Sequence, residues 1–260
     1  MSARRAHYEL EDRVAVVTLD NPPLNALNVD TREALAAVFA ELHGRRNEIR
    51  AVVLRGGGDK AFAAGADIKG FLDLDCASAR RQLLRAQEIN VAVESFPRPV
   101  LAAIHGYCLG GGLELALCCD CRFASEDAKF GFPEVKLSVF PGNGGTQRAR
   151  RHLSLGRVKE LMFTGDMVGA REALEYGLVE RVVPAGQVLE ATLAVAGRIA
   201  SRGPLAVAAV KAVLNATQGV PLAEGLEVEA DAWSRLAETE DMKEGARAFL
   251  EKREPLWKAK

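Results

Sequence analysis

Short apolar runs alternate with longer amphipathic segments through the first two thirds of the chain. Runs that are β-branched or continuously apolar predict strands at 14–19, 51–54 and 99–104. Between the first two runs, Leu35, Val38 and Leu42 recur at helical spacing. Residues 78–95 have a helical pattern as well. Because unbroken apolar runs are typical of strands covered on both faces, this alternation predicts an α/β fold.

The first predicted helix carries a start signal and a stop signal. Asp30 stands three residues before Glu33, which is the spacing of a capping box. Gly44 follows the last apolar position of the pattern and closes the helix. These signals place the helix between the first two predicted strands.

The pattern changes to helix alone after about residue 195. Pro221 opens a helix whose apolar positions form one stripe: Leu222, Leu226, Trp233 and Leu236. Thr239 is a suitable cap for a further helix that reaches about Lys252. We therefore expect a core over 1–195 and a helical oligomerisation region over 196–260. The apolar stripe must pack either on its own chain or on a neighbouring subunit.

Charge and hydropathy exclude several classes of partner. The 260 residues carry 34 Lys plus Arg against 35 Asp plus Glu, a formal net charge of −1. Nucleic-acid binding needs concentrated positive charge, so nucleic acid is not an expected partner. No run approaches the roughly 20 apolar residues that span a bilayer, so no membrane partner is expected either.

The cysteines and the N-terminal residues favour a cytoplasmic protein. Residues 1–6 lack the apolar region of a signal peptide. Five cysteines make an odd number without framework spacing, which favours reduced thiols. Cys118, Cys119 and Cys121 cluster on an apolar segment, where buried thiols are expected rather than metal ligands. No metal site is therefore predicted.

Three consecutive glycines, Gly110, Gly111 and Gly112, precede a short apolar helix. Bare backbone N–H groups at the positive end of a helix would stabilise developing negative charge. A tight strand-to-helix packing turn explains the same pattern and, for the glycines alone, is the favoured interpretation. A dinucleotide site is a weaker alternative because the spacing is not Gly-x-Gly-x-x-Gly.

Two acidic residues lie in apolar surroundings and could carry acid–base chemistry. Glu114 follows the glycines in a segment that should be buried, where a carboxylate is costly unless it is paired. A structural ion pair with Arg122 or Lys129 is an equally favoured explanation. Glu134 lies between aromatic residues and a glycine-rich turn, where it could be held neutral as a general acid. It could equally be an ordinary acid at a helix N-terminus.

Five segments of the chain resemble the crotonase superfamily, the enoyl-CoA hydratase/isomerase family, and together they extend over most of its length. They are AAGADIK (63–69), GYCLGGGLELA (106–116), FGFPE (130–134), PGNGGTQR (141–148) and AFLEKR (248–253). The resemblance implies a spiral of ββα units followed by a helical region that builds trimers or dimers of trimers. It also implies an acyl-CoA thioester as substrate and no permanently bound cofactor.

The resemblance assigns catalytic roles to particular residues. It implies that the backbone N–H groups of Ala66 and Gly111 bind the thioester oxygen. Glu114 matches the carboxylate that activates water, and Glu134 matches the acid that delivers a proton to the α-carbon. Gly142 matches a backbone N–H that helps to hold the water.

The resemblance also implies contacts with coenzyme A. The matching positions are Leu24, Ala64, Ala66, Asp67, Ile68, Lys69, Phe249 and Lys252. The first loop (21–27) departs from the family because it is short and has no lysine for the phosphates. Phe140 is larger than the usual residue and could reshape the acyl pocket. Residues 70–80 lie where the family varies and are expected to set acyl size.

Retention of both acids favours hydration of a 2-enoyl-CoA over the alternatives within the family. Those alternatives are isomerisation of an enoyl-CoA and hydration of a branched or cyclic enoyl-CoA. A protein that binds RNA or CoA without turnover is the alternative from another class.

Overall fold

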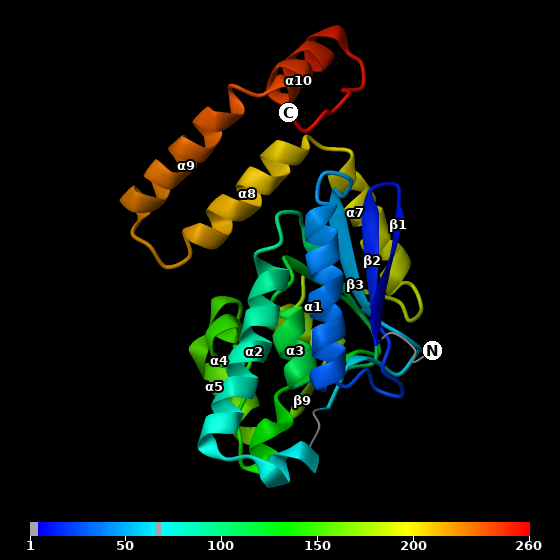
Figure 1. Ribbon diagram of the computed structural model, residues 1–260, viewed down its shortest axis with the longest axis vertical. Coiled ribbons are helices and arrows are strands. Elements are labelled where there is room, and N and C mark those ends of the chain that lie inside the picture. Colours follow the sequence, from blue (N-terminus) through cyan, green and yellow to red (C-terminus); the bar gives the residue numbers. More distant parts are fainter. Residues whose placement is uncertain (1–4, 66–68) are drawn as a thin grey trace.

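The computed structural model describes residues 5–65 and 69–260. Its larger sheet has the strand order β1-β2-β3-β5-β7-β10, in which β1 runs antiparallel to β2 and the other neighbours are parallel (Figure 1). The bounds are Ala6–Glu11 for β1, Val14–Leu19 for β2, Ala51–Gly56 for β3, Val100–Ile104 for β5, Cys121–Ser125 for β7 and Arg181–Val183 for β10. The α/β prediction is confirmed.

A second sheet has the order β4-β6-β8-β9, with an antiparallel pair between β8 and β9. Its strands are β4 (Ala61–Ala63), β6 (Tyr107–Leu109), β8 (Lys129–Gly131) and β9 (Met167–Gly169). Three of these strands directly precede a segment that carries expected site residues. This sheet therefore brings the glycine-rich turns of the chain together.

The described helices include short and long elements. The α-helices are α1 (Val29–Gly44), α2 (Cys76–Glu94), α3 (Gly111–Ala116), α4 (Gly145–Arg148), α5 (Leu155–Thr164), α6 (Ala170–Tyr176), α7 (Val188–Ala200), α8 (Pro204–Ala216), α9 (Leu222–Leu236) and α10 (Glu240–Glu251). The 3₁₀ helices are η1 (Lys69–Asp73), η2 (Pro133–Leu137) and η3 (Ala149–Arg151). Within the described residues no single helix has the length and apolar character to cross a membrane, and α7 with α8 pass that test only as a pair bent by 110°.

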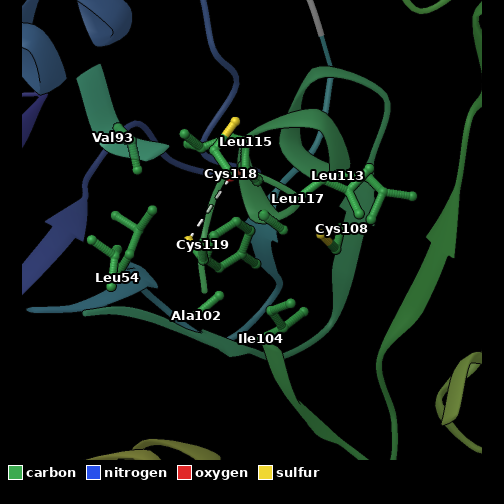
Figure 2. Close-up of a cluster of buried hydrophobic side chains, with 14 of the residues drawn as sticks. Leu54, Val93, Ala102, Ile104, Cys108, Leu113, Leu115, Leu117, Cys118 and Cys119 are labelled. Atoms are coloured by element: carbon green, nitrogen blue, oxygen red, sulfur yellow. Dashed lines mark hydrogen bonds between the residues drawn. The ribbon is translucent and has the colours of Figure 1, made fainter. Parts of the chain in front are cut away.

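The larger sheet is covered on both faces, which explains the unbroken apolar runs in its strands. Val53 and Leu101 lie in one buried cluster with Ala196 of α7. Their neighbours Val52 and Ala102 lie in the main cluster on the other face, together with residues of α1, α2 and α3. Figure 2 shows the apolar side chains of α3 gathered over β3 and β5. The position of α3 is therefore fixed by the core.

The start of α1 differs from the sequence prediction. Asn28, rather than Asp30, is the N-cap, and its side chain accepts a hydrogen bond from the backbone N–H of Thr31. Asp30 lies within the first turn, where its charge favours the helix dipole. The helix ends at Gly44, as predicted. Asn is as good a cap as Asp, so the spacing to Glu33 selected the wrong residue.

The C-terminal helices extend away from the body of the chain. Figure 1 shows α8, α9 and α10 beyond the upper end of the sheet, whereas α7 lies along it. The expected boundary between 195 and 196 falls inside α7, and Ala196 is buried against the sheet. The next helix, α8, begins at Pro204 and still contacts the body, because its buried Lys211 donates to the backbone oxygen of Arg98 and to Asp120. Thr239 caps α10, as predicted, and Lys252 follows its last residue.

Candidate active site

The turn into α3 requires glycine at two positions. Gly110 has φ = +53°, in the left-handed region that side chains disfavour. A Cβ on Gly112 would lie 1.9 Å from the backbone oxygen of Ala63, so only glycine allows β4 to approach this closely. Close packing therefore accounts for two of the three glycines. Gly111 is the first residue of α3, where a backbone N–H has no acceptor within the helix.

Glu114 lies one turn further along α3 and is fully buried. Its Oε1 accepts hydrogen bonds from the backbone N–H groups of Asn143, at 2.7 Å, and Gly145, at 2.8 Å. Its Oε2 accepts a bond of 2.7 Å from the side-chain amide of Asn143. A carboxylate offers about four acceptor positions, so these bonds leave one position open, on Oε2. Three donors stabilise the ionised form of Glu114.

The structural ion pair considered for Glu114 is not present. Arg122 is buried but forms its ion pair with Glu180, and it also donates to the backbone oxygen of Leu178. Lys129 is exposed on β8. The charge of Glu114 is therefore stabilised by amide donors rather than by either of these cations.

The turn that binds Glu114 is held in place by α2. The side-chain amide of Gln87 donates to the backbone oxygen of Gly142 at 2.7 Å, and that of Asn90 donates to the backbone oxygen of Asn143 at 3.0 Å. These bonds orient the turn so that its N–H groups face Glu114. Gln87 and Asn90 are polar side chains three positions apart on one helix. This spacing is a sequence signal for the contact, and it was not used in the prediction. The contribution of the Asn143 side chain was missed as well.

Glu134 lies in the first turn of η2, beside the start of α3. Its carboxyl packs against Gly110, where a Cβ would lie 2.7 Å from Oε1. Its Oε2 is buried and has no hydrogen-bond partner among the described residues. Burial raises the pKa of Glu134 to about 7; its own backbone N–H opposes this rise, and the charge of Glu114 adds to it. Glu134 therefore keeps its proton below about pH 7 and loses it above that pH.

The structure brings most of the expected catalytic residues together. Gly111 and Glu114 share α3, Glu134 touches the residue before that helix, and Gly142 directly precedes the residue that binds Glu114. The remaining expected residue, Ala66, lies outside the described residues. Two carboxyls, one stabilised as an anion and one as a neutral acid, suit a reaction that removes one proton and delivers another.

The residues expected to contact coenzyme A fall into two groups. The backbone N–H of Ala64 donates to the backbone oxygen of Leu24 at 2.8 Å, so these positions adjoin each other at the end of β4. Asp67 and Ile68 lie outside the described residues, as does the side chain of Lys69. Phe249 and Lys252 belong to the end of α10, which Figure 1 places away from α3. Within a single chain, the end of α10 is therefore not beside the start of α3.

The chain matches a family model described as enoyl-CoA hydratase/isomerase over residues 9–260. It is 41% identical over 250 residues to a crotonyl-CoA hydratase of Syntrophomonas wolfei, covering 94% of each chain. It is 38% identical over 251 residues to an (E)-benzylidenesuccinyl-CoA hydratase of Thauera aromatica, covering 96% of this chain and 97% of the relative. The crystal structure of an enoyl-CoA hydratase from Bacillus anthracis superposes with a TM-score of 0.94 at 38% identity, covering 98% of this chain and 100% of the other. The chain belongs to the enoyl-CoA hydratase/isomerase family.

Proposed function

We propose that this protein is an enoyl-CoA hydratase, which adds water across the double bond of a 2-enoyl-CoA to give a 3-hydroxyacyl-CoA. The observation that carries the proposal is that the two carboxyls lie in different environments. Three donors stabilise Glu114 as a carboxylate, whereas burial raises the pKa of Glu134 to about 7, so that this acid holds its proton up to near neutral pH. Hydration needs one base and one acid at the same time, and the site supplies both.

In the proposed mechanism, Glu114 removes a proton from water as the water oxygen attacks the β-carbon. The open acceptor position on Oε2 is where that proton arrives. Glu134 gives its proton to the α-carbon, so the double bond gains a hydroxyl group and a hydrogen. Both carboxyls then return to their starting states by one proton transfer between them or through solvent.

The backbone groups have supporting roles in this proposal. The N–H of Gly111 binds the thioester oxygen, on which negative charge develops, and the N–H of Ala66 supplies the second donor. The N–H of Gly142 helps to hold the attacking water. Loss of one such oxyanion donor typically costs about 3 kcal/mol of transition-state stabilisation.

Addition of crotonyl-CoA to the purified protein tests the proposed function. Hydration removes the conjugated double bond, so the ultraviolet absorbance of the enoyl thioester should fall without release of a free thiol. Absorbance loss accompanied by stoichiometric thiol release would indicate hydrolysis and contradict the proposal.

The pH dependence of hydration should report the titration of Glu134. The pKa of Glu134 is raised to about 7, and the reaction needs its protonated form, so activity is retained below this value and lost above it. We therefore expect kcat/KM for crotonyl-CoA to fall with rising pH around pH 7. A profile from pH 5 to 9 measures this limb. A flat profile across that range would show that no acid with this pKa takes part.

The acyl preference is proposed to depend on apolar side chains beside the site. The relatives reported above carry names with very different acyl groups, from crotonyl to benzylidenesuccinyl. Leu83 of α2 packs against Gly142, and Phe140 is exposed just before the same turn. Phe71 and Leu72 of η1 are also exposed. These side chains are candidates for the wall of the acyl pocket, and two of them, Phe71 and Leu72, belong to the segment 70–80.

The helices beyond α7 are proposed to form a trimer or a dimer of trimers. In the single chain, α9 buries no side chain, and Trp233 is 64% exposed. Leu222 and Leu226 of the same stripe are exposed as well. Apolar area of this kind is typical of a subunit interface. An interface between subunits would also explain how Phe249, which is 84% exposed, could reach a coenzyme A bound to a neighbour.

Substitution of Trp233 by Glu should therefore reduce the assembly to a smaller species, since it places a charge in the interface. Light scattering coupled to size-exclusion chromatography measures the mass. Ser234→Glu, one position away on the exposed helix, is the matched control and should leave the mass unchanged. A monomeric mass for the unsubstituted protein would contradict the proposed assembly.

A further inference from the structure

We propose that Arg32 is a positioning residue for hydration, whose guanidinium packs against Gly111 and stabilises the charged carboxylate of Glu114. The inference rests on the proposed function, because it concerns the base of that reaction. It assigns a role to a residue of α1, a helix that supplies none of the expected catalytic groups.

The geometry places Arg32 directly beside the site. Its Nε donates to the backbone oxygen of Leu27 at 2.9 Å, which directs the rest of the guanidinium along the start of α3. A Cβ on Gly111 would lie 3.0 Å from Nη2 of Arg32 and 3.7 Å from Nδ2 of Asn143. That same Nδ2 donates to Glu114. The cation and the third donor of Glu114 therefore lie on the same face of Gly111.

Few charged groups besides Arg32 lie near Glu114. Among the described residues, the groups that interact electrostatically with Glu114 are Arg32 of α1, Arg148 of α4, Glu134 of η2 and the thiol of Cys118, which lies two residues beyond the end of α3. Arg148 is already bonded to Glu94, at 2.6 Å. Arg32 has no carboxylate at hydrogen-bond distance in the described part of the chain.

The remaining neighbours do not replace the charge of Arg32. Burial raises the pKa of the Cys118 thiol to about 12, so this group is neutral. Burial lowers the pKa of the Arg32 guanidinium, and the negative charge of Glu114 opposes that shift. An arginine remains protonated in either case. Arg32 is therefore the cation that is free to favour the carboxylate of Glu114 over its protonated form.

This arrangement separates the roles of two neighbouring acids. Two nearby carboxyls compete for the same proton, and the three donors to Glu114 already favour its charged form. A cation beside Glu114 adds to that preference, so that Glu114 is the base and the proton stays on Glu134. Arg32 thus acts through Glu114, with no contact to the reacting atoms required.

The test compares Arg32→Met with Arg32→Lys and Arg32→Gln, using pH profiles of kcat/KM for crotonyl-CoA. In Arg32→Met and Arg32→Gln the limb at low pH should move to higher pH, because the cation beside the base is gone. Arg32→Lys keeps the charge and should show a smaller shift. Arg45→Met is the matched control, since it removes an exposed arginine that follows the last residue of the same helix, and its profile should match the unsubstituted protein.

The possible results distinguish a failure of the inference about Arg32 from a failure of the proposed function. An unmoved acid limb in Arg32→Met or Arg32→Gln, in a variant that melts cooperatively and still hydrates crotonyl-CoA, would overturn the inference while leaving the proposed function intact. A loss confined to an enoyl-CoA that carries a terminal carboxylate, such as glutaconyl-CoA, with no shift of the limb, would assign Arg32 to substrate binding and would also overturn it. Absence of hydration by the unsubstituted protein would overturn the proposed function itself.

Discussion

Replacing Glu114 by Gln is expected to lower kcat for hydration of crotonyl-CoA by about 10²–10⁴-fold, since the variant has no base to take the proton of water. The amide oxygen of Gln can still accept from the backbone N–H groups of Asn143 and Gly145. The NH₂ group of the new side chain would face the side-chain amide of Asn143. That amide can rotate so that its oxygen accepts a hydrogen bond from the NH₂ group. The fold should therefore survive, and the initial rate of absorbance loss measures the effect.

Glu160→Gln is the matched control for this experiment, because it makes the same chemical change at an exposed position of α5. It should hydrate crotonyl-CoA at the unsubstituted rate. Turnover near that rate in Glu114→Gln, with its thermal melting unchanged, would sink the assignment of Glu114 as the base.

Replacing Glu134 by Gln is expected to lower kcat by about 10²–10⁴-fold as well, because no group remains to protonate the α-carbon. The buried Oε2 of Glu134 has no partner among the described residues, and its carboxyl is neutral below about pH 7. A neutral amide therefore fits the same space at little cost to folding. The residual activity should lack the fall around pH 7, since the titrating group is gone.

The pH profile and the rate of Glu134→Gln together distinguish a catalytic acid from a structural one. A variant that is slow but keeps the fall around pH 7 would show that another group gives rise to it. A variant as fast as the unsubstituted protein would remove Glu134 from the mechanism.

The apolar pattern predicted the central part of the fold because the strands there are buried on both faces. The strand 14–19 coincides with β2, 51–54 lies within β3, and 99–104 begins one residue before β5. The strand β1 was not predicted, since its polar and partly exposed residues give no apolar run. The cap of α1 was misassigned because Asn28 and Asp30 are equally suitable in composition.

The candidate site could be predicted only in part from the residues themselves. A carboxyl in an apolar segment marked Glu114, but its alternative as an ion pair stayed open. The deciding partners, Asn143 and Gly145, come from about thirty positions further along the chain, and no local pattern reports such contacts. The role inferred for Arg32 depends in the same way on packing between α1 and α3.

Isotope labelling of the product tests the central claim most directly. Crotonyl-CoA would be incubated with the protein in D₂O enriched in ¹⁸O, and the product analysed by mass spectrometry and NMR. The paired-acid mechanism predicts 3-hydroxybutyryl-CoA with the ¹⁸O in the hydroxyl group at the β-carbon and one new deuterium at the α-carbon. Label in a free carboxylate with release of coenzyme A, or deuterium uptake without a water-derived hydroxyl group, would contradict it.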